Sequence, residues 1–411
     1  MKFKIVLMVS LLLFFRNTMA QDNVEINGFV RNYTGVLLNS SSEFSILQNT
    51  LNLTFAKQTD KVGFKVNPYL FHYSDSQLEL GLREAYLDFY IKDFAFRVGK
   101  QQIIWGKAEG VFITDIVSPK DLREFLLPDF EEIRVGVTSV KVNYIKGNHS
   151  FEAVWSPVFT PTQMPKSDSY WAPEMSFPMM PTWDYSTSSK DLNLENSEAF
   201  LRYSFMGSKF DFELVGGHFF YDDPAIHLIK IMDTATMQMS GLVARPDYQR
   251  VTMAGGSFSV PIGGLIFRGE GAYYDGRYFQ INNLMTSDAT IEKDYVHYMA
   301  GLDYTWKGIK LSTQFIQEYI IDYEDGINND EFENTMTFLI KKDFFREKLW
   351  VELFAYVGLN NEDALIRPRL TYAFADGFEL MTGFNFFTGE EGRFGQYDDN
   401  DMVYVKAKYS F

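Results

Sequence analysis

The 411-residue sequence contains no cysteine, only five histidines and no long hydrophobic run after its first twenty residues. The absence of cysteine excludes a disulfide framework and a cysteine-linked lipid anchor. No later stretch approaches the roughly 20 apolar residues that a transmembrane helix needs. The histidines are scattered singly, and the chain has no Gly-x-Ser-x-Gly, His-Glu-x-x-His or phosphate-binding glycine motif. The sequence therefore predicts no enzyme activity, no cofactor and no metal site.

The first twenty residues have the composition of an export signal. Two lysines precede an apolar run from Ile5 to Phe15, and Thr18-Met19-Ala20 is a plausible cleavage site. We therefore expect a signal peptide at residues 1–20 and an exported domain at residues 21–411. Three of the 38 basic residues lie in the signal, so 35 remain against 54 acidic residues, a difference of −19. This acidity argues against nucleic acid as a partner.

Alternation of apolar and polar residues predicts strands throughout the exported domain. Between Glu84 and Ile91 every second side chain is apolar, and a turn at Lys92-Asp93 leads into a second alternating run that contains Arg97. The pattern continues to the end of the chain and predicts about 18 strands, with 16 as the alternative. The connections between the predicted strands are alternately short and long, which is typical of a transmembrane antiparallel β-barrel with short periplasmic turns and long extracellular loops. The fold class is therefore all-β.

One face of many predicted strands is apolar, and the other carries charges of both signs. A soluble sandwich would bury the apolar face, whereas a membrane barrel turns it toward lipid and leaves the mixed charges facing the lumen. Alternation alone does not separate the two cases. Under the barrel interpretation, the predicted pore-lining or constriction residues are Glu84, Arg97, Lys107, Glu109, Asp121, Arg123, Glu352, Arg367, Arg369 and Glu379.

The predicted long loops are 105–131, 157–193 and 222–248. Loop 105–131 is rich in charges of both signs, and Ser118-Pro119 within it has the form of a helix start. It could form a constriction that sorts solutes by charge, or a structural plug held by salt bridges. Loop 157–193 combines six prolines with methionines and two tryptophans, which favours an ordered lid over a Cu(I) site or a sugar-stacking surface. Apolar residues at roughly helical spacing in loop 222–248 suggest packing against it.

The last strand carries a resemblance to a known class of proteins. Residues 401–411 alternate strictly and end on Tyr409-Ser410-Phe411, and this ending resembles the outer-membrane porins, whose final strand ends in phenylalanine and is read by the barrel-assembly machinery. The run RVGKQQIIWGKAEG at 97–110 and the loop that follows it resemble an uncharacterised family of porin-like barrels with an RxGxQxxxWG strand end. The resemblance implies a pore or transporter, an assembly signal at Tyr409 and Phe411, and a location in the outer membrane of a Gram-negative bacterium.

We therefore expect a channel for passive, partly selective diffusion of small solutes. The expected partners are outer-membrane lipid, lipopolysaccharide, the barrel-assembly machinery and the permeating solutes. Two alternatives remain open: a transporter of hydrophobic compounds, and a non-conducting structural or secretion-associated barrel. The sequence does not indicate the substrate or the oligomeric state.

Overall fold

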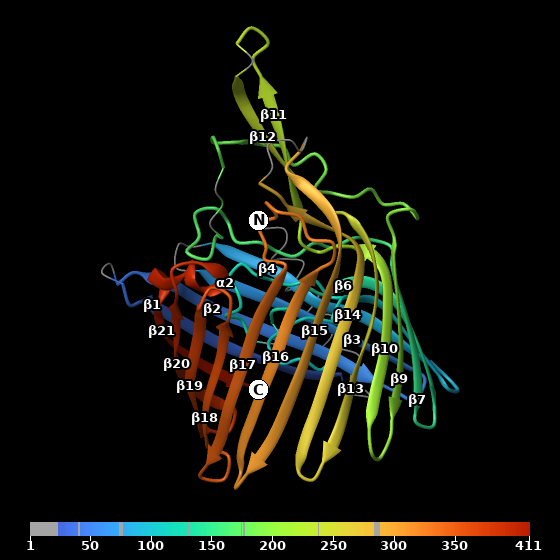
Figure 1. The fold of residues 1–411 in the computed structure, drawn as a ribbon. Coiled ribbons are helices and arrows are strands. Elements are labelled where there is room, and N and C mark those ends of the chain that lie inside the picture. The colour runs from blue at the N-terminus through green and yellow to red at the C-terminus, as the bar shows by residue number, and fades with distance from the viewer. Residues whose placement is uncertain are drawn as a thin grey trace, which may run out of the picture.

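The computed structural model describes residues 24–39, 42–73, 77–129, 132–173, 175, 177–236, 238–282 and 288–411. The predicted signal peptide lies outside these residues. Eighteen antiparallel strands form one closed sheet (Figure 1). The first and last strands close the barrel, with Phe29 opposite Ser410 and Leu37 opposite Met402. The barrel strands are β1 (Glu25–Leu37), β2 (Phe44–Gln58), β3 (Val62–Tyr73), β4 (Leu78–Ile91), β5 (Phe94–Gln101), β6 (Val137–Lys146), β7 (His149–Ser156), β9 (Glu198–Met206), β10 (Asp211–Phe220), β13 (Arg250–Ile262), β14 (Leu265–Gln280), β15 (Thr290–Trp306), β16 (Ile309–Ile320), β17 (Phe332–Phe344), β18 (Leu349–Gly358), β19 (Ala364–Ala375), β20 (Phe378–Thr388) and β21 (Met402–Ser410).

The two faces of the wall have the polarity of a membrane barrel. On β4, Leu87 and Ile91 are 53% and 61% exposed, whereas Glu84 and Asp88 between and beside them are buried. Large apolar side chains are likewise exposed on most other barrel strands, and charged residues such as Arg268 and Glu270 are buried inside. An exposed apolar face around a polar interior is stable only where hydrocarbon surrounds the barrel. The protein is therefore a transmembrane β-barrel, as the sequence predicted.

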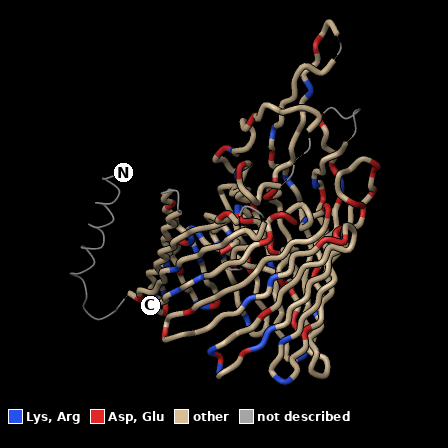
Figure 2. Tube along the Cα trace, turned by 90° about the vertical axis from the view of Figure 1, so that its left-hand side faces the viewer, with Lys and Arg blue, Asp and Glu red and all other residues tan. Residues whose placement is uncertain are grey.

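The connections differ in length at the two ends of the barrel. Short turns follow β2, β4, β6, β9, β13, β15, β17 and β19 at the end where β1 begins and β21 ends. The long loops gather at the other end, where Figure 2 shows many acidic residues. The predicted strand count of 18 is confirmed, and so is the turn at Lys92-Asp93, where Lys92 has a φ of 53°.

One local prediction was wrong. Ser118 does not cap a helix, because no helix is present in the described part of the connection between β5 and β6; its hydroxyl accepts a hydrogen bond from the backbone N–H of Ile103 at 2.8 Å. The apolar residues at roughly helical spacing in loop 222–248 belong to a β-hairpin of β11 (Ala225–Met232) and β12 (Met239–Asp247), because their spacing suits a strand as well as a helix turn.

The long loops contact one another above the barrel. Strand β8 (Thr182–Trp183), from loop 157–193, pairs in parallel with β12 and completes a three-stranded sheet that rises from the barrel (Figure 1). The described helices are α2 (Gly392–Gly395) and the 3₁₀ turn η2 (Asp398–Asn400) between β20 and β21. In the described part of the chain no helix is long and apolar enough to cross a bilayer.

Candidate functional site in the barrel lumen

The connection between β5 and β6, residues 102–136, folds into the barrel, and we call it the inserted segment. Its described residues contact the inner wall on nearly every side. On β14, the carboxylate of Glu270 accepts hydrogen bonds from the backbone N–H groups of Lys107 (2.5 Å), Ala108 (2.9 Å) and Thr114 (2.8 Å). Three donors on one buried carboxylate hold the segment more firmly than hydrogen bonds between neutral groups would.

Gly106 allows the chain to wrap around this carboxylate. Its φ is 84°, and a Cβ at this position would lie 2.5 Å from Oε1 of Glu270. The neighbouring Trp105 is buried and donates its indole N–H to Glu152 on β7 at 2.7 Å. The Trp-Gly pair that ends the motif at 97–110 thus fixes the start of the inserted segment.

Three further wall residues hold the segment farther along. Gln314 on β16 accepts from the N–H of Glu109 and donates to its carbonyl, at 2.9 and 2.8 Å. Tyr356 on β18 donates its hydroxyl to the carbonyl of Gly110 at 2.8 Å. Arg367 on β19 donates to the carbonyls of residues 126 and 127, at 2.8 and 3.0 Å. The segment therefore crosses the lumen as an ordered partition.

One half of the lumen is filled by apolar packing. Side chains from the first part of the inserted segment are buried against the inward side chains of β6 to β16. These segment residues are Ile103, Trp105, Ile113, Ile116 and Val117, and their wall partners include Val154, Phe200, Phe219, Met253, Tyr274, Met299 and Ile316. Such a cluster is packed like the core of a soluble protein and excludes water. This half of the lumen is therefore closed by side chains.

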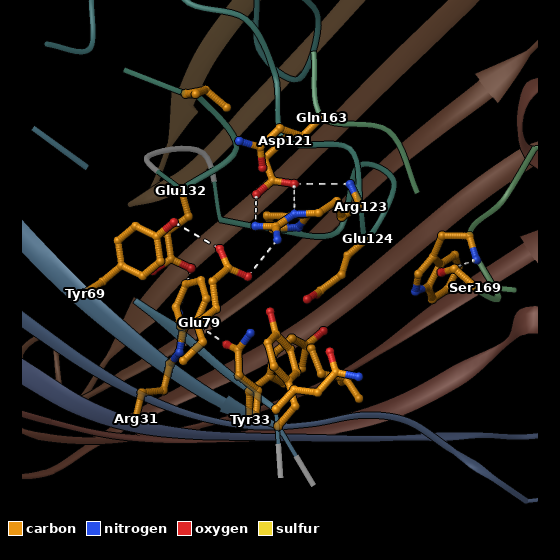
Figure 3. Close-up of a pocket in the computed structure, with 18 of the residues that line it drawn as sticks. Arg31, Tyr33, Tyr69, Glu79, Asp121, Arg123, Glu124, Glu132, Gln163 and Ser169 are labelled. Atoms are coloured by element: carbon orange, nitrogen blue, oxygen red, sulfur yellow. Dashed lines mark hydrogen bonds and ion pairs between the residues drawn. The ribbon is translucent and has the colours of Figure 1, made fainter. Parts of the chain in front are cut away.

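The opposite side contains a cavity of about 550 Å³, which we call the lateral cavity (Figure 3). Strands β1 to β4 form one wall, and the inserted segment and part of loop 157–193 form the other. Its lining is rich in aromatic and charged side chains: Arg31, Tyr33, Tyr69, Phe71, Tyr73, Glu79, Arg83, Asp121, Arg123, Glu124, Glu132, Trp171 and Lys406. The volume falls within the range of about 300–1,000 Å³ found for small-molecule sites.

A first ion network spans the lateral cavity from the segment to the wall. Arg123 donates to both carboxylate oxygens of Asp121, at 2.8 and 2.7 Å, and to Glu79 on β4 at 2.8 Å. Glu79 also accepts the hydroxyl of Tyr69 at 3.1 Å. Figure 3 shows these groups around the cavity, with the dashed contacts running between segment and wall.

A second network joins the segment to the strands that close the barrel. Arg31 on β1 contacts Glu132 at 2.9 Å and Asp129 at 3.7 Å, and Lys406 on β21 contacts Asp129 at 3.1 Å. Despite burial, these cations hold the pKa of Asp129 well below its usual range. Asp129 therefore lies as a carboxylate between Arg31 of β1 and Lys406 of β21.

Glu124 differs from the other carboxylates around the cavity. Its carboxylate makes no hydrogen bond or ion pair within the described part of the chain, and it points into the cavity in Figure 3. Enclosure by protein raises its pKa to about 7, helped by Asp121 and Glu132 and opposed by Lys406 and Arg31. Its charge therefore changes near neutral pH.

The predicted lumen residues fall into separate groups. Glu84 and Arg97 face inward, but each is paired within the wall, with Lys65 at 2.6 Å and Asp88 at 2.7 Å respectively. Lys107 and Glu109 are held by their backbones on the β14 and β16 side, and Asp121 and Arg123 line the lateral cavity.

Glu352, Arg367 and Arg369 lie around a smaller cavity of about 150 Å³ on the other side of residues 126–129. There Arg369 pairs with Glu352 at 2.6 Å. Glu379 lies on β20 opposite Lys408, outside both cavities.

Several residues of the site were missed from the sequence. The wall anchors Glu270, Gln314 and Tyr356 could not be found, because nothing local marks which inward residue a distant segment will touch. The aromatic row Tyr69, Phe71 and Tyr73 could have been found, since three aromatics at alternate positions on one strand share a face. Tyr409 and Phe411 lie at the end of β21, and both are about half exposed on the outer face.

Comparison with known proteins agrees with this architecture. Residues 13–350 match a family described as "Protein of unknown function (DUF1302)". The chain belongs to this family. No curated protein matches the sequence.

Solved structures with the same fold are outer-membrane porins. OccK8 (OprE) of Pseudomonas aeruginosa has a TM-score of 0.59 at 11% identity, over 95% of this chain and 98% of that one. OccK2 (OpdF) of the same species, solved in complex with glucuronate, has a TM-score of 0.56 at 11% identity over the same shares. OccAB4 of Acinetobacter baumannii has a TM-score of 0.55 at 9% identity, over 96% of this chain and 99% of that one. This family member is therefore an outer-membrane β-barrel with the fold of porin channels.

Proposed function

We propose that this protein is a channel for the passive, partly selective diffusion of small solutes, with its path along the inner wall of β1 to β4. One observation carries the proposal: apolar packing fills the β6 to β16 side of the lumen, and the lateral cavity of about 550 Å³ lies on the opposite side, where charged side chains line it. Opposed charges along a narrow path sort solutes by charge as well as by size. Partial selectivity follows from the paired cations and carboxylates around the lateral cavity.

The same packing weakens the two alternatives. A transporter of hydrophobic compounds needs an open apolar path, but the apolar side chains in the lumen pack directly against one another. A non-conducting barrel has no need for a cavity of about 550 Å³ lined by charged groups. We also propose outer-membrane lipid, lipopolysaccharide and the barrel-assembly machinery as partners, since acidic loops can share divalent cations with lipopolysaccharide (Figure 2).

The absence of cysteine makes the path directly testable. Tyr73→Cys places a single thiol in the lateral cavity, and Ile316→Cys places one in the apolar half. We expect a charged, membrane-impermeant thiol reagent to reduce the single-channel current of the Tyr73→Cys barrel in planar bilayers. The Ile316→Cys barrel should keep its current, because its thiol is out of contact with water.

The reverse pattern would place the path through the other half of the lumen. A correctly folded wild-type barrel without conductance would favour the non-conducting alternative. Conductance that is unaffected at both positions would mean that ions avoid both sites, and would contradict the proposed path.

A further inference from the structure

Three aromatic rings form a row along the inner face of β3. Tyr69, Phe71 and Tyr73 occupy alternate positions, so they point to the same side and follow one another at about 7 Å along the strand. The ring centroids of Tyr69 and Phe71 are 4.6 Å apart, and those of Phe71 and Tyr73 are 6.3 Å apart. All three line the lateral cavity. We call them the aromatic row.

Neighbouring strands extend this row into a platform. Gln48 on β2 lies directly opposite both Tyr73 on β3 and Tyr33 on β1 in the sheet register. Directly opposed residues of an antiparallel pair point to the same side, so the two tyrosines flank one amide in the wall. The platform thus presents flat apolar faces with polar groups between them.

Planar charged groups from this wall and from the inserted segment surround the platform. Arg123 is held by Asp121 and Glu79, and Arg31 is held by Glu132. Glu79 joins the two surfaces, since it accepts hydrogen bonds from both Arg123 and the Tyr69 hydroxyl. Guanidinium and carboxylate groups fixed in this way can each offer a further donor or acceptor to a solute.

The pairing of these charges restricts the class of solute. A charged solute that binds the Asp121–Arg123–Glu79 network would have to draw one partner out of an existing ion pair, and the group left behind would remain uncompensated in a narrow space. A neutral solute with many hydroxyls avoids this cost, because each hydroxyl donates and accepts and can bridge between the partners of a pair. A sugar ring also has a C–H face that packs on an aromatic ring.

We propose that the lateral cavity is a binding site for a neutral carbohydrate of one or two rings, which lies on the aromatic row and hydrogen-bonds to the Asp121–Arg123–Glu79 network. The proposal rests on the proposed channel function for its role in transport. The cavity volume of about 550 Å³ suits a solute of this size. Binding partway along the path makes the diffusion of such sugars saturable.

The test is calorimetric titration of the full barrel in detergent with maltose, a neutral two-ring sugar. We expect saturable binding that Tyr73→Ala weakens roughly two- to tenfold and Tyr73→Phe retains, because the ring is kept. Phe354→Ala is the matched control, since Phe354 is an aromatic residue of the smaller cavity. It should bind maltose like the wild type. Glucuronate, a charged sugar, should bind more weakly than maltose.

Equal or tighter binding of glucuronate would overturn the preference for neutral sugars. Three results would refute the proposed maltose site: no maltose binding by the wild-type barrel, binding by Tyr73→Ala as tight as that of the wild type, or binding that Phe354→Ala weakens as much as Tyr73→Ala does. If Tyr73→Ala does not assemble, Tyr73→Leu also removes the aromatic ring but keeps more of the side-chain volume, and it should weaken maltose binding in the same way. The titration does not depend on conduction. A barrel that binds maltose but does not conduct would refute only the proposed channel function. A barrel that conducts but does not bind maltose would refute only this inference.

Discussion

The Oε1 atom of Glu270 accepts two hydrogen bonds from Thr114, one from its backbone N–H and one from its hydroxyl, both at 2.8 Å. A wall carboxylate thus holds the turn of a segment that is 156 residues away in the sequence. Glu270→Gln places an amide NH₂ where the carboxylate accepted these bonds. Since hydrogen bonds to charged groups contribute about 1.5–3 kcal/mol each, the variant should loosen the inserted segment.

We expect single-channel recordings of Glu270→Gln to show larger and noisier conductance than the wild type, with normal assembly. Glu213→Gln is the control, because Glu213 is an inward carboxylate on β10 whose hydrogen-bond and ion-pair partners in the described part of the chain, Ser204 and Arg202, both belong to the wall. Identical recordings for the two variants would mean that Glu270 does not hold the partition.

A charge on the lipid-facing side of the wall should destabilise the barrel by an amount that depends on its depth in the bilayer. Leu353→Arg on β18 puts such a charge on the outward face and should lower the free energy of unfolding by about 2–4 kcal/mol if it lies near the bilayer midplane. Leu359→Arg makes the same change six residues later, just beyond the end of β18, and should cost about 0–1 kcal/mol. Unfolding in urea from lipid vesicles measures both. Equal costs would mean that this face does not meet hydrocarbon at Leu353.

Arg367 and Arg369 should have separable effects, although both are among the predicted pore-lining or constriction residues. Arg369→Gln leaves Glu352 with Lys341 as its remaining ion-pair partner, so the cation-to-anion permeability ratio should rise with little change in conductance. Arg367→Gln removes the donors to two carbonyls of the inserted segment, so conductance itself should change. Reversal potentials and single-channel currents in a salt gradient separate the two, and indistinguishable variants would contradict the assigned contacts.

The pKa of about 7 at Glu124 predicts a pH-dependent selectivity. As pH rises from 6 to 8 the carboxyl loses its proton, and the lateral cavity gains negative charge beside Asp121 and Glu132. The cation-to-anion permeability ratio should therefore rise over this interval in the wild type and stay flat in Glu124→Gln. Because the folded-state pKa of about 7 lies above the usual value of 4.5, this group also lowers the stability of the fold as pH rises from 4.5 to about 7. A pH profile that Glu124→Gln leaves unchanged would assign the titration to another group.

The terminal aromatic residue is expected to act during assembly. Phe411 exchanges two backbone hydrogen bonds with Gly28, both at 2.9 Å, so deleting it would also weaken barrel closure. Phe411→Ala keeps these bonds and removes only the ring. We expect less folded, heat-modifiable barrel in outer-membrane fractions for Phe411→Ala, and normal amounts for Phe374→Ala, which removes an aromatic residue of β19 that is 73% exposed. Equal yields would show that the ring is not an assembly signal.

Strand positions were predictable because apolar and polar side chains alternate along each strand and because each strand ends at a local turn. The alternation around Glu84 and Asp88 reveals which residues share a face without any distant partner. The conformation of the inserted segment was not predictable in the same way. Ser118-Pro119 satisfies the local rule for a helix start, yet anchors such as Glu270 and Gln314 hold the segment in an irregular path. Long-range hydrogen bonds determine the conformation of this segment, and such bonds leave no local pattern in the sequence.

The inserted segment also constrains the order of assembly. Tyr356 hydrogen-bonds to Gly110 at a sequence separation of 246 residues, and Lys406 on β21 contacts Asp129 at a separation of 277. These contacts cannot form until the C-terminal strands have been synthesised and brought beside β1. Until then the inserted segment lacks its anchors to the C-terminal strands, and the pairing of β21 with β1 both closes the wall and fixes the partition within it. Closure of the barrel and completion of its interior are one event.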